Sequence, residues 1–464
     1  MFIMKIRDYL TAMSGKRVAV LGIGVSNTPL IKLLLRAGAK VTACDKCERE
    51  QLGDVADELE SLGAELRLGE GYLHNLKHFD VIFRTPGMRP DLPQLLEAVE
   101  HGAVLTSEME AFFEVCPCRI IAVTGSDGKT TTTTIIAKLL QAAGYNTYLG
   151  GNIGKPLLTD AIGMEAGDIA VVELSSFQLM TMKRSPSIAV VTNLAPNHLD
   201  VHTSMSEYVA AKENIYIHQT AGDKVILNYD NDITRGFGED VPGGRTWFSR
   251  KERLDPGVCL RDDAIWVYGV DGSRREVLPL KDILLPGQHN VENYMAAIAA
   301  VDGLVPDNVI RYFAAEFGGV EHRIELVREL DEVRYYNDSI ASSPSRTIAG
   351  LRSFDQKVIL IAGGYDKQIP FDEFGVEVNK HVKELFLTGT TAEKIKAAVE
   401  QAPEYNPENL KITVLDGFEE TIKAAHVAAQ PGDVVLLSPA CASFDKFKNF
   451  AQRGEEFKRI VYEL

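Results

Sequence analysis

The sequence has little of what defines secreted or membrane proteins. It contains six cysteines among 464 residues, too few for a disulfide scaffold. The pairs Cys44-x-x-Cys47 and Cys116-x-Cys118 have zinc-like spacing, but no second pair of ligands accompanies either. No apolar run reaches the roughly 18 residues that a membrane helix needs, and the first residues form no apolar signal core. We therefore expect a cytoplasmic protein with reduced thiols and no membrane association.

The sequence is also short of positive charge. Its 49 lysines and arginines face 65 acidic residues, which gives a formal net charge of −16. Such a surface repels nucleic acid on average, so we expect no nucleic-acid partner, and an anionic ligand must be held by local cations. The length and a hydrophobic content of 45% predict a globular protein of about three domains.

The clearest motif spans residues 120–135, with the sequence IIAVTGSDGKTTTTTI. An apolar strand runs into two glycines and then into a helical pattern, and this arrangement points successive backbone N–H groups at a phosphate. Lys129 adds a mobile positive charge, and the Thr130 hydroxyl can hold Mg²⁺. The G-x-x-G-K-T spacing is shorter than that of the ordinary Walker loop. The alternative is a plain strand-to-helix turn with a solvated lysine.

A strand–helix–strand pattern over residues 17–45 opens the chain. Its first strand ends in Gly22-x-Gly24 and its second in Asp45, the arrangement that places phosphates at the first turn and a ribose near the acidic residue. Asn27 stands where the third glycine of the fingerprint belongs, so the signal is weak. A dinucleotide dehydrogenase therefore stays open as an alternative.

Further elements follow in α/β alternation. We expect strands at residues 81–85, 168–176, 187–194, 224–228, 333–337, 357–362, 384–387, 412–415 and 434–437, a hairpin at 264–278, and helices at 206–219 and after residue 290. The predicted fold is α/β in three domains: a Rossmann-like domain at 1–107, a central P-loop domain with a mainly parallel sheet at 108–318, and a C-terminal Rossmann-like domain at 319–464.

Polar residues stand near the ends of several of these elements. Glu173 lies near the end of an apolar strand, where a carboxylate is costly to bury unless it is paired or binds a metal. His198 follows the next strand, and its simplest interpretation is a loop histidine with a hydrogen-bonded partner. Lys212 on an amphipathic helix is ordinarily a solvated charge. His289 and Asn290 precede an alanine-rich helix, where simple capping would explain them.

Six motifs occur together in one order. They are GSDGKTTT at 125–132, ELSSFQ at 173–178, NHLD at 197–200, GQHN at 287–290, EHR at 321–323 and the segment 438–453. In this order the chain closely resembles the Mur ligase family over essentially its whole length. The segments GGNIG at 150–154, LSSFQ at 174–178 and SPACASFDKFKNFAQRG at 438–454 are similar to the members that add D-glutamate to UDP-N-acetylmuramoyl-L-alanine. The Asp-Asn-Pro-Arg signature of the diaminopimelate- or lysine-adding members is absent.

The resemblance implies an ATP-dependent amide ligase of peptidoglycan precursor synthesis. A substrate carboxylate would attack the γ-phosphate of ATP, and an amino-acid amine would displace phosphate from the acyl phosphate. The implied substrates are UDP-N-acetylmuramoyl-L-alanine, D-glutamate and ATP, with two Mg²⁺ sites and a carbamylated Lys212. We expect a monomer.

The resemblance also implies roles for individual residues. ATP would contact Gly125, Ser126, Asp127, Gly128, Lys129, Thr130, Thr131, Asn290, Arg323 and Asp338. Mg²⁺ would contact Thr130, Glu173, His198 and Lys212, and the catalytic residues would be Lys129, His198 and Lys212. The sugar nucleotide would contact Gly24, Asp45, Lys46, Thr85, Gly87, Asn152 and His198. D-glutamate would contact Ser342, Lys367, Ser443 and Phe444.

One departure from the family pattern affects the amino-acid pocket. Relatives usually have Asp-Ser-Lys-Ala-Thr where this chain has Asp-Ser-Ile-Ala-Ser at 338–342, so Ile340 replaces a lysine. Ser343 and Pro344 predict a helix start, and a helix start favours an anion. Arg346 lies in that first turn, an unfavourable place for a cation unless an anion is bound beside it. Our hypothesis is that Arg346, this helix end and Lys367 replace the missing lysine.

Three alternatives remain at this point. The dehydrogenase would leave Lys129, Glu173, Lys212 and Arg323 without a use. A regulatory or motor P-loop NTPase would hydrolyse ATP without an amino acid, whereas a ligase would release phosphate only with both cosubstrates. Other Mur-type ligases and folylpolyglutamate synthase are the nearest competitors among ligases, and the latter lacks an N-terminal uridine nucleotide domain.

Overall fold

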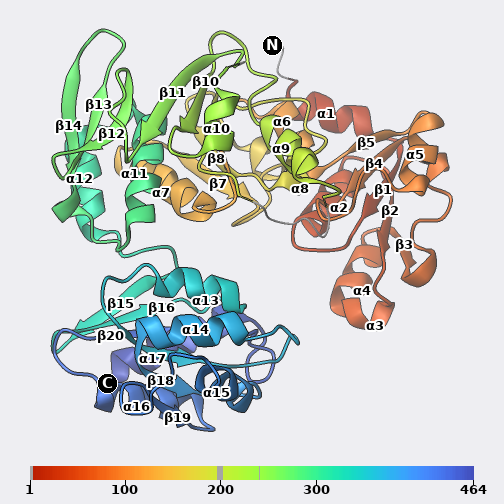
Figure 1. The fold of residues 1–464 in the computed structure, drawn as a ribbon. Helices are drawn as coiled ribbons and strands as arrows, with labels where there is room; N and C mark the ends of the chain where they lie inside the picture. The colour runs from red at the N-terminus through yellow and green to blue at the C-terminus, as the bar shows by residue number, and fades with distance from the viewer. Residues whose placement is uncertain (1–3, 196–201, 240) are drawn as a thin grey trace. The chain divides into compact units, whose positions relative to one another are not determined.

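The computed structural model describes residues 4–195, 202–239 and 241–464 (Figure 1). The chain divides into two compact units: one comprises Met1–Leu280 and Glu292–Phe313, and the other comprises Lys281–Val291 and Ala314–Leu464. No helix within the described ranges is both long enough and apolar enough to cross a bilayer.

The first unit begins with a parallel sheet of five strands in the order β3-β2-β1-β4-β5. The strands are β1 (Arg17–Leu21), β2 (Lys40–Asp45), β3 (Glu65–Leu68), β4 (Val81–Arg84) and β5 (Val104–Thr106). The helices are α1 (Ile6–Met13), α2 (Asn27–Arg36), α3 (Arg49–Leu52), α4 (Asp54–Ser61) and α5 (Pro93–Glu100). Because the chain reverses its order between β1 and β4, the loops that follow these two strands flank the place where open parallel sheets bind ligands.

A nine-stranded sheet forms the rest of this unit, in the order β14-β13-β12-β11-β10-β9-β6-β8-β7. Its strands are β6 (Arg119–Thr124), β7 (Thr147–Gly151), β8 (Ile169–Glu173), β9 (Ile188–Val191), β10 (Lys224–Asn228), β11 (Gly244–Ser249), β12 (Gly257–Arg261), β13 (Ala264–Tyr268) and β14 (Arg274–Pro279). The helices are α6 (Glu108–Val115), α7 (Lys129–Ala142), α8 (Ser176–Leu179), α9 (Met205–Glu213), α10 (Asp232–Phe237) and most of α11 (Gln288–Val301) and α12 (Asp307–Glu316). The pairing is parallel from β7 to β12 and antiparallel from β12 to β14. Strand β6 lies between β9 and β8, and the helix that follows it, α7, lies beside α11 (Figure 1).

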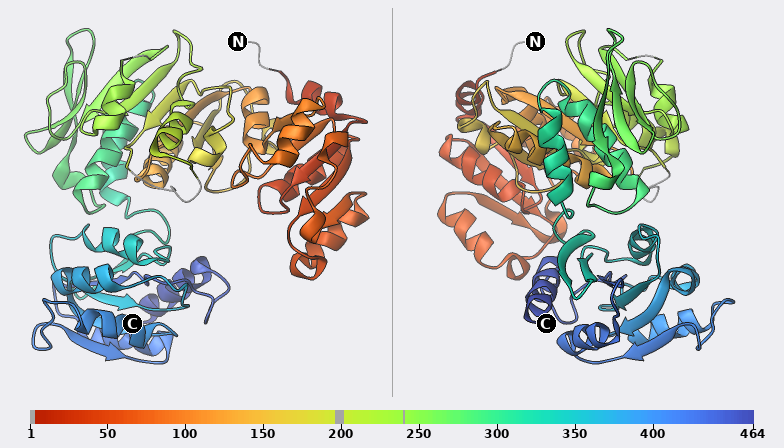
Figure 2. Two further views of the ribbon diagram at one scale, coloured as in Figure 1. Left: turned by 45° about the vertical axis from the view of Figure 1, so that its right-hand side comes forward. Right: turned by 90° about the vertical axis from the view of Figure 1, so that its left-hand side faces the viewer.

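The second unit is a six-stranded sheet with helices on both faces (Figure 2). Its strands, in sheet order, are β15 (Glu325–Leu330), β16 (Val333–Asn337), β20 (Val434–Leu437), β17 (Val358–Ala362), β18 (Val382–Leu387) and β19 (Lys411–Val414). The helices are α13 (Pro344–Leu351), α14 (Asp372–His381), α15 (Ala392–Glu400), α16 (Phe418–Ala428) and α17 (Phe450–Glu463). Neighbouring residues of β17 join different cores: Leu360 packs with α13, α14 and α15, whereas Ile361 packs with α16 and α17. This alternation explains why the strand is continuously apolar in sequence.

The predicted strands are largely confirmed, with corrections to the ends of two elements and five strands that were missed. The strand expected at 168–176 ends at Glu173, because Ser175 accepts from the Gln178 N–H and caps α8. The helix expected at 206–219 ends at Glu213. Strand β15, which pairs antiparallel with β16, was not predicted, and neither were β3, β7, β11 and β12. The division into three domains at residues 107 and 318 stays a prediction.

Candidate active site

The loop between β6 and α7 has the backbone that a phosphate cradle requires. Gly125 and Gly128 have φ values of 148° and 76°, which side chains rarely adopt. A Cβ atom on Gly125 would lie 1.9 Å from Thr192 Oγ1, and one on Gly128 would lie 2.3 Å from Asn293 Oδ1. Both glycines are therefore fixed by conformation and by close neighbours, and the predicted strand, glycine turn and helix are confirmed.

The two middle residues of this loop are held by the segment that follows the neighbouring strand β9. The Asp127 N–H donates to Asn193 Oδ1 at 2.9 Å, and Thr192 Oγ1 donates to the Asp127 carbonyl at 2.6 Å. Ser126 Oγ donates to the Ala195 carbonyl at 3.0 Å. These contacts leave the loop preorganised without any ligand.

The loop also gathers the predicted phosphate and magnesium groups. Lys129 Nζ donates to the Ser126 carbonyl at 2.8 Å, so the ammonium lies across its own loop. Thr130 Oγ1 donates to Glu173 Oε2 at 2.7 Å, and Asn152 Nδ2 donates to Glu173 Oε1 at 2.8 Å. The carboxylate of Glu173 is almost completely buried. The strand predicted at 168–176 is therefore shorter than expected, but the prediction that Glu173 lies near its end is confirmed.

A hydroxyl and a buried carboxylate in contact form a donor set that fits Mg²⁺, which prefers oxygen ligands. Thr130 and Glu173 would hold the ion, and the ion would compensate the buried negative charge that the Thr130 hydroxyl now stabilises.

Lys212 lies beside the same loop and is not the solvated lysine that its helix position suggests. Its side chain is 2% exposed, and Nζ donates to Thr124 Oγ1 and to the Gly125 carbonyl, both at 2.9 Å. Burial lowers the pKa of Lys212 well below its ordinary value; the positive charge of Lys129 lowers it further, and Glu173 opposes the shift. Lys212 is therefore a buried amine in surroundings that disfavour its protonated form.

His198, predicted at a second Mg²⁺ and at the sugar nucleotide, lies outside the described residues. Another histidine, His202, was not predicted and is buried in the described part of the chain. Its Nε2 lies 2.9 Å from Ser176 Oγ, and its ring stacks on Phe177 with centroids 5.4 Å apart. It therefore fixes the start of α8, just after Glu173.

Five of the seven residues predicted for the sugar nucleotide lie at the carboxyl end of the first sheet. Asp45 Oδ2 accepts from the Ile23 N–H at 2.6 Å, so the acidic residue that ends β2 holds the turn after β1. The Thr85 N–H donates to the Leu21 carbonyl at 3.0 Å. A Cβ on Gly22 would lie 3.1 Å from Thr85 Cβ, so the first turn and the loop after β4 are in contact.

The remaining members of this set are Gly24 and Lys46, which are exposed, Gly87 in the loop after β4, and Asn152, which instead lies on the nine-stranded sheet beside Glu173.

In the second unit, the predicted ATP contact Asp338 has a shifted pKa. Its carboxyl is buried at the end of β16 and accepts from Ser438 Oγ at 2.7 Å. Burial raises the pKa of Asp338 to about 7, while Ser438, Arg323 and Arg346 act in the opposite direction. Asn290, another predicted contact, is buried and its Nδ2 donates to the Pro286 carbonyl at 2.5 Å.

The predicted amino-acid pocket places two cations on the segment that contains Ile340. Arg346 Nη1 donates to the Ile340 carbonyl and Lys367 Nζ to the Ser342 carbonyl, both at 3.4 Å. The predicted helix start is confirmed, since α13 begins at Pro344 with Ser343 in the N-cap position.

The other side of this region comes from the segment after β20. The Tyr365 N–H donates to the Ala442 carbonyl at 2.9 Å, and the Tyr365 and Phe444 rings meet edge to face with centroids 6.0 Å apart. Ser443 is buried, and Phe444 is exposed. The loops that carry Lys367 and Phe444 are thus adjacent.

Comparison with known proteins agrees with this geometry. The family described as Mur ligase middle domain matches residues 123–301, and the family described as Mur ligase, glutamate ligase domain matches residues 322–441. The chain is 53% identical over 462 residues to a UDP-N-acetylmuramoylalanine–D-glutamate ligase of Acetivibrio thermocellus, with 99% of each chain covered. A ligase of the same name from Clostridium novyi is 52% identical over 449 residues, with 97% of each covered. The chain belongs to the Mur ligase family.

Solved structures show the same fold at lower identity. A UDP-N-acetylmuramate-alanine ligase from Thermotoga maritima matches with a TM-score of 0.58 and 18% identity, covering 97% of this chain and 99% of that one. A pseudomurein peptide ligase type C from Methanothermus fervidus matches with a TM-score of 0.53 and 18% identity, covering 97% and 100%. As a Mur ligase the chain is an ATP- and magnesium-dependent enzyme of peptidoglycan synthesis, which excludes the dehydrogenase and the regulatory NTPase.

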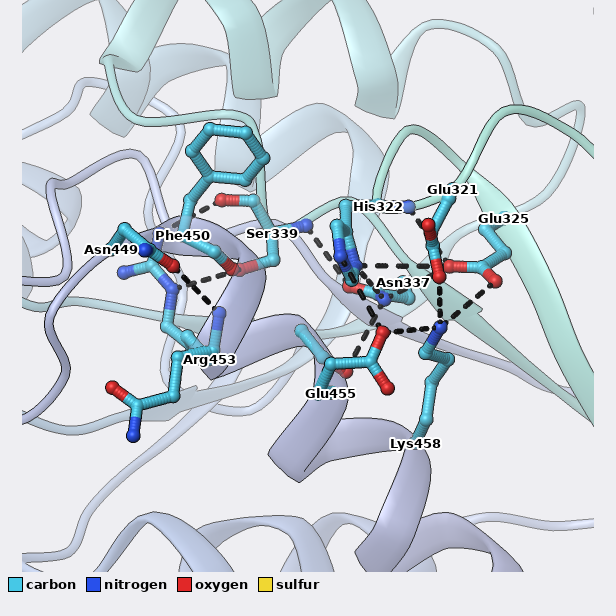
Figure 3. A network of polar contacts seen from close by, with 12 residues as sticks. Glu321, His322, Glu325, Asn337, Ser339, Asn449, Phe450, Arg453, Glu455 and Lys458 are labelled. Atoms are coloured by element: carbon cyan, nitrogen blue, oxygen red, sulfur yellow. Dashed lines mark hydrogen bonds and ion pairs between the residues drawn. The ribbon is translucent and has the colours of Figure 1, made fainter. Parts of the chain in front are cut away.

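This Mur ligase also contains a buried arginine that the residue-by-residue prediction missed. Arg453 of α17 donates through Nη2 to the Ser339 carbonyl at 2.8 Å and to the Cys441 carbonyl at 3.1 Å, and through Nη1 to the Ala442 carbonyl at 3.2 Å. Figure 3 shows its guanidinium at Ser339. It joins the loop after β16 to the loop after β20. The sequence near Arg453 gives no sign of this role, because it depends on contacts between segments that are distant along the chain.

A second polar cluster of the second unit lies next to Arg453 and resembles a metal site in composition. Glu321, His322 and Glu455 are the one group of three potential metal ligands found among the described residues. However, Lys458 Nζ lies 2.7 Å from both Glu321 Oε1 and Glu455 Oε1 (Figure 3). The lysine already supplies the cation that these carboxylates need, so the cluster is an ion-pair network that joins α17 to the segment before β15.

Proposed function

We propose that this Mur ligase adds D-glutamate to UDP-N-acetylmuramoyl-L-alanine in an ATP-dependent reaction. The observation that carries the proposal is the convergence of Lys129, the Thr130–Glu173 pair and buried Lys212 on one phosphate loop. The names of relatives that are about half identical over nearly the whole chain support the same substrates. The solved structure named as an alanine ligase is only 18% identical to this chain, far below these relatives.

The residues divide the work of the reaction. The loop N–H groups and Lys129 would bind the phosphates of ATP and stabilise the charge that develops during phosphoryl transfer. Thr130 and Glu173 would hold Mg²⁺, which neutralises phosphate charge when bound. The carboxylate of the sugar nucleotide would then attack the γ-phosphorus. The bond between this phosphorus and the bridging oxygen would break, and ADP would leave with that oxygen. The amine of D-glutamate attacks the resulting acyl phosphate, releasing inorganic phosphate and one proton.

Phosphate release with separate omission of each cosubstrate tests this proposal. We expect release only when UDP-N-acetylmuramoyl-L-alanine, D-glutamate, ATP and Mg²⁺ are all present, with the dipeptide product in equal amount. L-glutamate, L-lysine, meso-diaminopimelate and L-alanine serve as controls for the amino acid. Equal turnover with any of these amino acids would contradict the assigned specificity.

The amino-acid pocket gives a separate prediction for Arg346. We propose that its guanidinium and Lys367 bind D-glutamate in place of the lysine that Ile340 replaces. Because Arg346 is exposed, the loss of one charged contact in Arg346→Ala should reduce kcat/KM for D-glutamate by about tenfold. The KM for ATP should change little.

Arg352, at the other end of α13, is the matched control. Its Nε pairs with Glu377 at 2.9 Å, so Arg352→Ala should leave the kinetics with D-glutamate unchanged. If Arg346→Ala behaves like Arg352→Ala in steady-state kinetics, the pocket depends on Lys367 without help from this arginine.

A further inference from the structure

Arg84, the last residue of β4, is buried although arginine is rarely buried without partners. Its Nη1 donates to the Pro86 carbonyl at 3.0 Å and to the Met88 carbonyl at 2.8 Å. Both acceptors belong to residues 85–88, the loop predicted to bind the sugar nucleotide. The guanidinium therefore fixes the backbone of this loop by binding two of its carbonyl groups.

The other arm of the same guanidinium reaches the nine-stranded sheet. Arg84 Nη2 donates to the Phe177 carbonyl at 3.0 Å and to Thr181 Oγ1 at 2.9 Å. Phe177 lies in α8, the short helix that follows the strand ending in Glu173. One planar group thus joins the loop after β4 to the helix after β8.

Thr181 connects this arginine to a carboxylate. Its hydroxyl accepts from Arg84 and donates to Glu110 Oε2 at 3.1 Å, and Ser107 Oγ donates to the same oxygen at 2.8 Å. The Glu110 charge opposes the effect of burial, which lowers the pKa of Arg84. Arg84, Thr181 and Glu110 therefore form a charge-compensated chain of hydrogen bonds between the two sheets of the first unit.

We propose that Arg84 is a positioning residue that presets the 85–88 loop for the sugar nucleotide and holds it in a fixed place relative to the strand that carries Glu173. This inference rests on the proposed function, because it assumes that the loop binds UDP-N-acetylmuramoyl-L-alanine. Arg84 itself does not contact the substrate in this account, since both arms of its guanidinium bind the protein. A lysine keeps the charge but lacks the planar fork that reaches both sides at once.

The test compares Arg84→Lys, Thr181→Val and Thr181→Ser with the parent enzyme. We expect Arg84→Lys to raise the KM for the sugar nucleotide about tenfold, because charged hydrogen bonds from the buried guanidinium to the loop are lost, with the KM for D-glutamate unchanged. Thr181→Val should raise the same KM by about threefold. Thr181→Ser retains the hydroxyl, so its KM for the sugar nucleotide should equal that of the parent enzyme. Calorimetric binding of UDP-N-acetylmuramoyl-L-alanine without ATP should weaken in parallel.

Arg17 provides the matched control, because it lies at the opposite end of the same sheet and pairs with Asp80 at 2.8 Å on the surface. Arg17→Lys should match the parent in both assays. An Arg84→Lys enzyme with a lower melting temperature but an unchanged KM for the sugar nucleotide would overturn the inference. If Arg84→Lys does not fold, the pair Thr181→Val and Thr181→Ser decides, and equal KM values overturn it. A parent enzyme that neither binds nor turns over the sugar nucleotide would instead refute the proposed function, and the inference with it.

Discussion

Replacing Lys129 by alanine should lower kcat for ligation by about 10²–10³-fold or more, while the fold survives. The ammonium lies 2.8 Å from the Ser126 carbonyl, at the start of α7. It is the cation best placed to stabilise charge on a transferring phosphoryl group. Because this hydrogen bond joins Lys129 to its own loop, we expect the packing of β6 and α7 to survive its removal.

The measurement is coupled phosphate release at saturating substrates, with circular dichroism to verify the fold. Lys138 of the same helix is exposed and is the matched control, so Lys138→Ala should retain the parent kcat. A Lys129→Ala enzyme with near-normal turnover would show that the loop does not bind the reacting phosphates.

The second large effect is expected at Lys212. Burial lowers the pKa of this amine well below its ordinary value and so favours its neutral form, and only the neutral amine can attack dissolved carbon dioxide. The attack forms a nitrogen–carbon bond and releases one proton, and the product is a carbamate with carboxylate-like oxygens beside Lys129. We expect Lys212→Ala to lose nearly all activity, on the order of 10³-fold, because these oxygens disappear. Lys212→Arg should be equally inactive, since a guanidinium cannot form the carbamate.

Rescue distinguishes a carbamate from a structural lysine. Formate or acetate added to Lys212→Ala can enter the vacated space and supply two oxygens, so part of the activity should return with saturation. Lys224 is the control: it is half-buried and also has a lowered pKa, but its Nζ donates to the Ala299 carbonyl at 2.9 Å at the opposite end of β10 from the loop. Lys224→Ala should lose stability and gain nothing from carboxylates. Full activity in Lys212→Arg would rule out the carbamate.

The sequence was most informative where the chemistry lies in one continuous segment. The strand, glycine turn and helix at residues 119–142 were predicted because each step is local: apolar run, glycines, then lysine and threonine at a helix start. Glu173 could also be identified, since a carboxylate at the end of an apolar strand is unusual. Its contact with Thr130 depends on β8 pairing with β6, which the order of the motifs suggested but did not determine.

Contacts between distant segments could not be predicted. Arg84 and Arg453 donate to carbonyls about 90 and 110 residues away along the chain, and nothing in their local sequence distinguishes them from surface arginines. Asn293 is the same case: its amide oxygen lies against Gly128 and accepts from Thr132 Oγ1 at 3.2 Å, although the two segments are about 160 residues apart. Strand β15 was missed because its alternating polar residues are typical of an edge strand with one exposed face.

The second compact unit is not one continuous length of chain, and this affects how the protein can be cut or recombined. The chain passes between the units after residues 280, 291 and 313. Residues 281–291 belong with the second unit, where the Leu284 N–H donates to the Ala314 carbonyl at 3.0 Å. A recombinant fragment that begins at residue 319 therefore lacks residues 281–291 and 314–318 of the second unit. In a chimera of two relatives, a single junction near residue 280 preserves every contact inside the second unit. It also places residues 292–313 of one relative against the first unit of the other. The part of this protein that can be exchanged is therefore defined by packing and not by sequence order.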